Sequence, residues 1–251
     1  MFPRLTAFDI VKLFFRALFT LLVIAVFVVL FWRMSAARVP AHLETLTPND
    51  ALAAAYETHG DALTTLTQEQ NTITRTKENY GYFAVSGATF IPAADQLQLL
   101  VRYNDSTLKA LKTDYALDFL PESDKDWYDV TVVLAIDKTP TDKTDNLSND
   151  PESVELVRVH PSALVAAEHK GRHSYRKLVF DGIPIECETL LAVYVDFYYV
   201  GDVAYTREDF NIYEDKAYGT LCLYAYTEES INVVKPITDK DKKALVGDKN
   251  D

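Results

Sequence analysis

One long apolar run near the N-terminus limits what this chain can be. From Ala17 to Trp32 the sequence reads ALFTLLVIAVFVVLFW, and Leu13–Phe15 extend this run to about twenty residues that only Arg16 interrupts. A helix of this length rises about 30 Å, which matches the hydrocarbon core of a bilayer. The run has no polar stripe with a helical period, which a helix on a soluble surface would show. We therefore expect a transmembrane helix over 13–32, with the lipid bilayer as its partner.

A cleaved signal peptide is the alternative for this segment. Ser35-Ala36-Ala37 supplies small residues of the kind found at cleavage sites. However, the apolar run is longer than the roughly 7–15 residues usual in a signal peptide. Trp32, Arg33 and Met34 also fit poorly just before a cleavage site. An uncleaved signal anchor is the favoured interpretation.

Basic residues around the run predict its orientation. Arg4, Lys12 and Arg16 precede or begin it, whereas Arg33 and Arg38 follow it closely. Because cytoplasmic flanks carry the excess of Lys and Arg, the bias favours a cytoplasmic N-terminus by one residue. The sequence thus predicts a single-pass membrane protein whose C-terminal domain is extracytoplasmic.

The rest of the chain has the composition of a folded domain. The chain is 48% hydrophobic and 25% charged, which is close to average globular usage and excludes wholesale disorder. Its formal net charge of −12 argues against a nucleic-acid partner, because phosphates require a basic face. Two cysteines are too few for a disulfide scaffold.

Beyond Gly60 the hydrophobic residues recur with a period of two, which is typical of strands with one face on a core. In the stretch Tyr128–Ile136, for example, Val132 is expected in the core and Thr131 on the solvent face. The clearest alternating stretches are 96–103, 128–137, 191–200 and 221–226. Weaker strands are expected near Ile73–Thr76, Tyr82–Phe90, Val154–Val159, Ala163–Glu168 and Tyr175–Phe180.

Helix signals are few. Thr47-Pro48-Asn49-Asp50 predicts a helix start with Thr47 as the cap, and Gly60 is placed to end that helix. Ser106–Ala116 predicts one short helix between strands. The fold class is therefore mainly β: an antiparallel β-sandwich, of which the immunoglobulin-like arrangement is one form, after one transmembrane helix and a short membrane-proximal helix. The expected organisation is a cytoplasmic segment 1–12, the span 13–32, a linker and short helix 33–60, the β-sandwich domain 61–238 and a flexible tail 239–251.

No motif predicts a metal, a cofactor or a catalytic residue. Glu168, His169 and His173 are close in sequence, but Lys170-Gly171 between them favours a hairpin tip over a zinc site. Three aspartates in the polar loop 137–152 lack the spacing of a calcium site: Asp142, Asp145 and Asp150. Nucleophile-elbow, phosphate-loop and dinucleotide-binding motifs are absent from the sequence.

Tyrosine is the residue type that points to a binding surface. All 15 tyrosines follow the apolar run. Alternation places two of them on one face of each of two strands, where amphipathic rings would suit a protein or saccharide partner: Tyr194, Tyr198, Tyr224 and Tyr226. The competing interpretation is that these rings pack at the ends of the sandwich with their hydroxyls in water.

Three smaller features stay open. Asp196 lies mid-strand, where it is a perturbed acid in a groove, a carboxylate that faces water on the outer sheet surface, or a carboxylate paired with a basic residue of a neighbouring strand. Cys187 and Cys222 are either one disulfide or, more in keeping with the sequence, two separate buried thiols. Asn104 and Asn146 begin triplets that fit the glycosylation pattern.

The sequence therefore predicts a membrane-anchored protein that presents a non-enzymatic β-rich interaction or scaffolding domain to a protein or envelope partner. The alternative is a membrane-tethered hydrolase or a ligand- or saccharide-binding module. Its site would be the tyrosine-rich face or the loop 137–152.

Overall fold

The computed structural model describes most of the chain: residues 7–68, 72–75, 82–118, 120, 128–138, 154–185, 187, 189–199, 217–225 and 232–246. It divides into two compact units, Met1–Arg38 and Val39–Asp251. The first holds one long helix, and the second holds every described strand.

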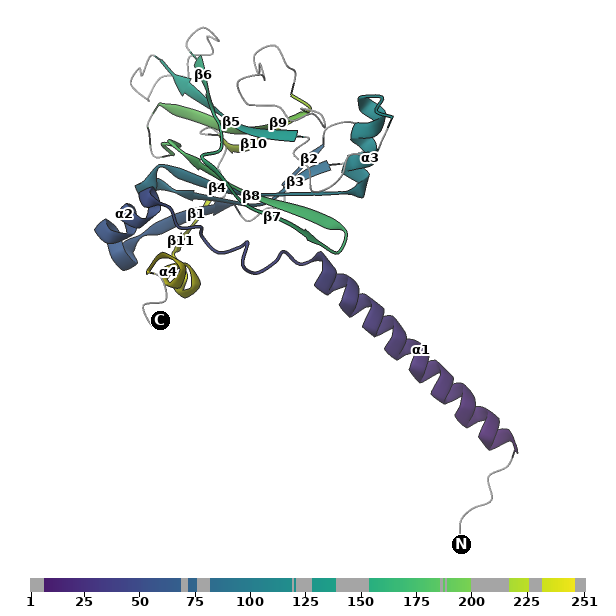
Figure 1. Ribbon diagram of the computed structural model, residues 1–251. Coiled ribbons are helices and arrows are strands. Elements are labelled where there is room, and N and C mark those ends of the chain that lie inside the picture. The colour runs from purple at the N-terminus through teal and green to yellow at the C-terminus, as the bar shows by residue number, and fades with distance from the viewer. Residues whose placement is uncertain are drawn as a thin grey trace, which may run out of the picture. The chain divides into compact units, whose positions relative to one another are not determined.

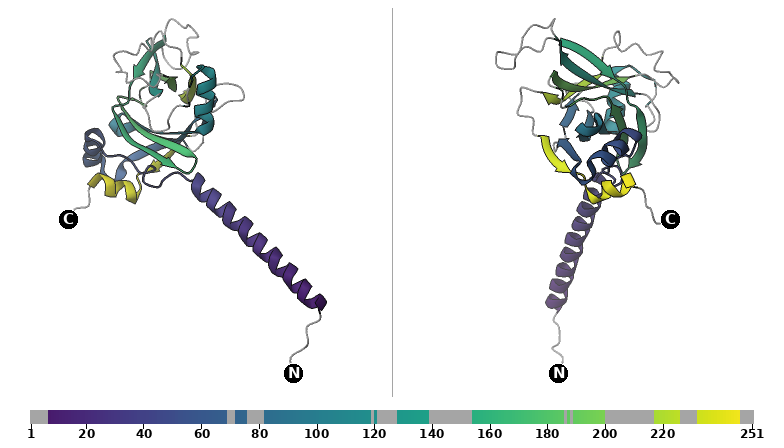
Figure 2. Two further views of the ribbon diagram at one scale, coloured as in Figure 1. Left: turned by 45° about the vertical axis from the view of Figure 1, so that its right-hand side comes forward. Right: turned by 90° about the vertical axis from the view of Figure 1, so that its left-hand side faces the viewer.

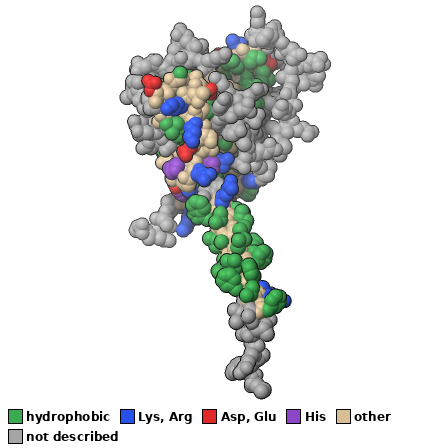
Figure 3. Space-filling model, turned by 90° about the vertical axis from the view of Figure 1, so that its right-hand side faces the viewer, with side chains coloured by type: hydrophobic (Ala, Val, Ile, Leu, Met, Phe, Trp, Pro, Cys, Tyr) green, Lys and Arg blue, Asp and Glu red, His purple; other side chains and the backbone are tan. Residues whose placement is uncertain are grey.

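Helix α1 (Ala7–Ala37) forms over the apolar run. A window from Val11 to Met34, 24 residues with a mean hydropathy of 2.8, is long and apolar enough to cross a membrane. Its large side chains are exposed, as Figure 3 shows. The hydroxyl of Thr20 donates to the carbonyl of Arg16 at 2.8 Å, so this polar group in the run is satisfied within the helix.

Seven strands form the larger antiparallel sheet, here called sheet A. Its order is β11-β1-β3-β4-β8-β7, and β2 also pairs with β3 (Figure 1). The bounds are β1 (Thr64–Gln68), β2 (Thr72–Arg75), β3 (Tyr82–Ile91), β4 (Gln96–Asn104), β7 (Ala163–Lys170), β8 (His173–Asp181) and β11 (Asn232–Pro236).

Four strands form the second antiparallel sheet, sheet B, in the order β10-β9-β5-β6. The bounds are β5 (Tyr128–Asp137), β6 (Val154–Val159), β9 (Leu190–Tyr199) and β10 (Gly219–Ala225). Every strand predicted from alternation is present. The structure is thus mainly β with two antiparallel sheets, as expected.

The two sheets share one hydrophobic core. Phe83 of β3 stacks on Phe197 of β9 with ring centroids 4.6 Å apart, and lies 4.9 Å from the ring of Tyr128 on β5. The apolar residues at alternate positions of the strands supply most of this cluster, including Val132 and Val195 at 0% exposure. The period-two pattern therefore identified the core faces correctly.

Short helices flank sheet A, with α2 (Asp50–His59) and α4 (Asp239–Val246) at one end and α3 (Asp105–Asp114) at the other (Figure 2). The 3-10 turns η1 (Gly60–Ala62) and η2 (Pro92–Ala94) complete the described helical elements. Gly60 has φ of 55°, a conformation that glycine adopts without strain and that ends α2. A second small core lies under α2 and α4: Leu46, Leu52, Ala55, Leu63, Ile91 and Ile237.

Several local expectations need correction. Asn49, not Thr47, caps α2: its side chain accepts the amide of Leu52, because its own backbone is extended. Residues 239–246 were expected in a flexible tail but are helical, since Thr238 and Asp241 close the first turn through mutual hydrogen bonds. No disulfide joins the two cysteines, and both are exposed rather than buried.

Candidate functional sites on the outer sheet faces

The segment after α1 is bonded to sheet A and to α4 by side chains of both. Residues 39–49, here called the strap, cover the face of sheet A that points away from the shared core. Leu43 of the strap is 3% exposed and packs on Leu100 of β4 and Tyr175 of β8. The strap is therefore part of the fold rather than a free linker.

Two glutamines of β4 hold the strap, one through its backbone and one through the side chain of Asn49. Gln98 accepts the Thr47 amide and donates to the Thr47 carbonyl, each at 2.8 Å. Gln96 donates to the side chain of Asn49 at 2.9 Å and to the carboxylate of Asp181 at 2.8 Å. Alternation explains the placement, because these glutamines lie on the outer face while Leu97 and Leu99 lie in the core.

Lys177 of β8 also holds the strap by a hydrogen bond. It is only 5% exposed, and its ammonium group donates to the carbonyl of Thr45 in the strap. Burial lowers the pKa of Lys177 to about 8, although the charge of Asp241 opposes this shift. A lysine amine held in this way is charged at neutral pH and becomes largely neutral in mildly alkaline solution.

Asp241 of α4 joins the two ends of the domain. One carboxylate oxygen accepts the amide of Leu46 at 2.7 Å, and the other accepts the Thr238 hydroxyl at 2.6 Å.

Asp181 lies at the far end of the strap. Burial raises its pKa, but hydrogen bonds from Ser162, Gln96 and Asn49 outweigh this effect and hold the pKa below its usual value.

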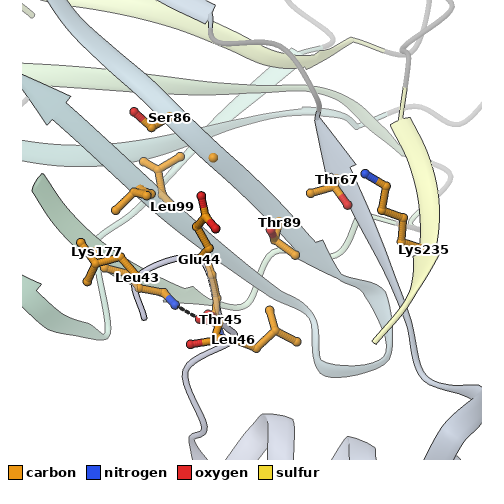
Figure 4. Close-up of a pocket in the computed structure, with 13 residues that line it drawn as sticks. Leu43, Glu44, Thr45, Leu46, Thr67, Ser86, Thr89, Leu99, Lys177 and Lys235 are labelled. Atoms are coloured by element: carbon orange, nitrogen blue, oxygen red, sulfur yellow. Dashed lines mark hydrogen bonds between the residues drawn. The ribbon is translucent and has the colours of Figure 1, made fainter. Parts of the chain in front are cut away.

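A cleft of about 490 Å³ opens between the strap and strands β1, β3 and β4. Figure 4 shows Glu44 of the strap in the middle of this cleft, with Lys177 on one side and Lys235 on the other. Hydroxyl groups from Thr67, Ser86 and Thr89 add to the lining. The side chain of Ser86 is buried without a hydrogen bond to any described residue. The mixture of charges and hydroxyls suits a small polar ligand better than an apolar one.

The outer face of sheet B carries the predicted tyrosine surface. Tyr194 is half-buried, but Tyr198 is 2% exposed, and its hydroxyl donates to Asp196 at 3.1 Å. Burial and then the Asp196 charge raise the pKa of Tyr198. Tyr224 lies on β10 and its side chain is not described, while Tyr226 is outside the described residues. A flat aromatic platform at these four positions therefore stays a prediction.

Asp196 itself is an outer-face residue that is buried. It accepts the Thr220 hydroxyl of β10 at 2.7 Å in addition to the Tyr198 bond. Nearby, the ring of His160 lies 3.9 Å from the carboxylate of Asp129, which is also buried. Asp196 therefore does not face water, and its bonds described here go to hydroxyl groups of β9 and β10.

The other sequence candidates resolve differently. Lys170-Gly171 does form a hairpin turn, where His42 bonds Glu168 at 2.7 Å and His169 bonds Ser174 at 3.1 Å. Among the described residues, no three His, Cys, Asp or Glu side chains are grouped as a metal site would need. Residues 139–153, which include most of the polar loop, lie outside the described part. Asn104 caps α3 through its side chain, which accepts the amides of Ser106 and Thr107.

Sequence reasoning missed the strap and the side chains that bond it to the sheet. The polar residues that hold it, Gln96, Gln98 and Lys177, occupy ordinary outer-face positions of strands. Nothing in such a position distinguishes a solvated side chain from one that a distant segment covers. No known protein family, curated protein or solved structure matches the chain.

Proposed function

We propose that this chain is a single-pass membrane protein in which α1 anchors a non-enzymatic, β-rich interaction or scaffolding domain on the extracytoplasmic side. The observation that carries the proposal is the exposed apolar window Val11–Met34. So large an apolar surface requires lipid or another apolar cover in solution. The charge bias across the run supports the orientation.

The strap supports a scaffolding role. It follows α1 with only Arg38 between them, and it is fastened to sheet A through side chains of β4, β8 and α4. The segment that follows α1 is therefore part of the folded domain. The finer β-sandwich arrangement is also part of this proposal, supported by the core that the two sheets share. The immunoglobulin-like form of that sandwich stays a prediction.

The second candidate function is a tethered ligand- or saccharide-binding module, or a hydrolase. The cleft beside Lys177 favours it, because convergent polar groups in a concave site are typical of small-ligand sites. A saccharide that raises the unfolding temperature of the wild-type chain but not of a Lys177→Met variant would support this alternative.

The anchor is tested by membrane extraction of the full chain. Wild type should stay in the membrane pellet through high salt and carbonate. Val23→Asp with Val26→Asp should release it, because two aspartates near the centre of the helix cost roughly 5–7 kcal/mol. Ala51→Asp with Ala54→Asp, at exposed positions of α2 with the same spacing, is the matched control and should stay in the pellet. A soluble wild-type product that begins near Arg38 would show that the segment is a cleaved signal and overturn the proposal.

A further inference from the structure

We propose that the cleft between the strap and sheet A binds a small organic anion, whose carboxylate or phosphate group is held by Lys177 and Ser86. The proposal rests on the second candidate function given above, a ligand site at this cleft, and does not depend on the anchor. It assigns a ligand chemistry to the cleft and names the groups that recognise it.

Hydrogen-bond donors dominate the polar side chains that line the cleft. Two lysines contribute ammonium groups, and residues of β1 and β3 contribute hydroxyl groups: Lys177, Lys235, Thr67, Ser86 and Thr89. Gln98 also lines the cleft, but its amide is bonded to Thr47 and Gln96. Among the described residues of the lining, Glu44 is the one carboxylate. A lining rich in donors suits a carboxylate or a phosphate, whose oxygens accept hydrogen bonds.

Lys177 has hydrogen-bonding capacity left for a ligand. Its ammonium group carries three donors, and among the described residues it bonds only the Thr45 carbonyl. The charge of Asp241 acts on this amine, but Asp241 does not line the cleft and is bonded to the Leu46 amide and the Thr238 hydroxyl. Because burial lowers the pKa of Lys177 only to about 8, the amine is charged at neutral pH.

Ser86 is brought to the cleft by a β-bulge. Val85 and Ala88 of β3 both lie in the shared core, and the register with β4 shifts between Val85 and Gly87. Two residues instead of one therefore separate these core positions, and both of them, Ser86 and Gly87, line the cleft. The Ser86 hydroxyl is buried and makes no hydrogen bond to any described residue, which is costly unless a ligand or water satisfies it. Bulges beside binding sites commonly re-aim a side chain in this way.

Strand pairing places these two groups in one row across the outer face of sheet A. Lys177 is opposite Leu100 of β4, and Leu100 is opposite Gly87, the residue after Ser86. Two strand spacings are about 10 Å, a gap that a lysine side chain and one oxyanion fill together. A carboxylate or phosphate that lies over Leu100 can thus accept hydrogen bonds from both groups. The cleft of about 490 Å³ leaves room for the organic part of the ligand.

Glu44 is the group that an anion has to displace. It is an exposed residue of the strap, lies in the middle of the cleft (Figure 4), and makes no hydrogen bond or ion pair with the described residues. An exposed glutamate side chain of this kind can turn toward water when the anion enters. Its charge still opposes an anion, whereas a cationic ligand would need it. The direction of the effect of Glu44→Gln on binding therefore identifies the charge of the ligand.

The test is calorimetric titration of the full chain at pH 7, in a nonionic detergent whose headgroup is not a sugar. The probes are glucose, glucuronate and glucose 6-phosphate, which share a sugar ring and differ in the anionic group. At least one of the two anions should bind tenfold or more tightly than glucose, because a hydrogen bond to a charged group contributes about tenfold or more. The tighter anion identifies the recognised group as a carboxylate or a phosphate.

Variants locate the site. For the tighter anion, Ser86→Ala should weaken binding about tenfold, Lys177→Met should weaken it more than tenfold, and Glu44→Gln should strengthen it by roughly threefold. Ser86→Ala and Glu44→Gln remove no side-chain hydrogen bond to a described residue, so they stay informative if Lys177→Met is unstable. Lys109→Met, at an exposed position of α3, removes the same charge as Lys177→Met and should leave binding unchanged.

The outcomes separate this proposal from the others. If glucose binds as tightly as both of its anionic forms, the anion site is wrong and the second candidate function stands. If none of the three probes binds, the anion site is wrong and the cleft no longer supports the second candidate function. Loss of binding in Glu44→Gln, or unchanged binding in both Ser86→Ala and Lys177→Met, would also overturn the anion site. The membrane anchor is tested separately, by the extraction experiment.

Discussion

At the scale of single residues, Lys177 makes the stability of the domain depend on pH. Its pKa is lowered to about 8 in the fold against 10.5 when unperturbed. Between these values the unfolded chain binds more protons than the folded one, so the free energy of unfolding rises with pH. We expect a gain of about 2 kcal/mol between pH 8 and pH 10 in the fragment Val39–Asp251. Denaturant unfolding at several pH values measures this change in the free energy of unfolding. The Lys177→Met variant should not show the gain.

The control for this prediction is Lys235→Met. Lys235 also lines the cleft, but it is an exposed residue of β11. Its variant should keep the wild-type dependence on pH. Tyrosines whose pKa is raised, such as Tyr198, act in the opposite direction above about pH 10, because the folded state then holds the extra proton. A slope that is equal in wild type and Lys177→Met over pH 8–10 would contradict the role of Lys177.

The sequence predicts single residues well only where one local pattern decides their environment. Val132 lies in the shared core, as alternation predicts. Its partner on β9, Val195, lies in the same core. Thr131, expected on the solvent face, is 0% exposed and lies opposite Asp196. The burial of Thr131, like that of Lys177, depends on what covers an outer face, and strand periodicity carries no information about that.

At the scale of elements, the strap and α4 depend on each other through Asp241. This carboxylate binds the Leu46 amide and caps the first turn of α4. Asp241→Ala leaves a buried amide without its acceptor and removes a cap, at a cost of about 2–4 kcal/mol in unfolding free energy. Hydrogen exchange should show the Leu46 amide losing protection first.

Asp239→Ala is the matched control at the start of the same helix. Asp239 is exposed and lies in the first turn, where a carboxylate contributes at most about 1 kcal/mol through the helix dipole. If the two variants lose equal stability, and the Leu46 amide stays protected in both, then Asp241 does not fasten the strap.

Long strands with a clear alternation of apolar residues were predicted from the sequence, and short strands were not. Long strands such as β5 and β9 have five alternating apolar positions each, and both were predicted. The five-residue strands β1 and β11 were missed, since TTLTQ and NVVKP alternate too briefly to stand out. They pair with each other along their whole length although they are about 170 residues apart in the chain, and β1 also pairs with β3.

At the scale of the whole molecule, both ends of the domain fasten to the same sheet. The strap lies on the outer face of sheet A, β11 pairs with β1 at its edge, and α4 binds the strap. Ordering of the C-terminal segment therefore stabilises the segment nearest the anchor.

The orientation of the molecule can be read from its own cysteines. Cys187 and Cys222 are exposed thiols that no disulfide joins, and both belong to the β-rich unit. If the domain is extracytoplasmic, a membrane-impermeant maleimide should label the wild-type chain in intact cells or spheroplasts. A variant with both cysteines replaced by serine and with Thr6→Cys added before α1 should be labelled only after the membrane is opened, because its thiol would be cytoplasmic. The reverse pattern, with the wild type protected and position 6 labelled, would place the domain in the cytoplasm and overturn the orientation that the flanking charges predict.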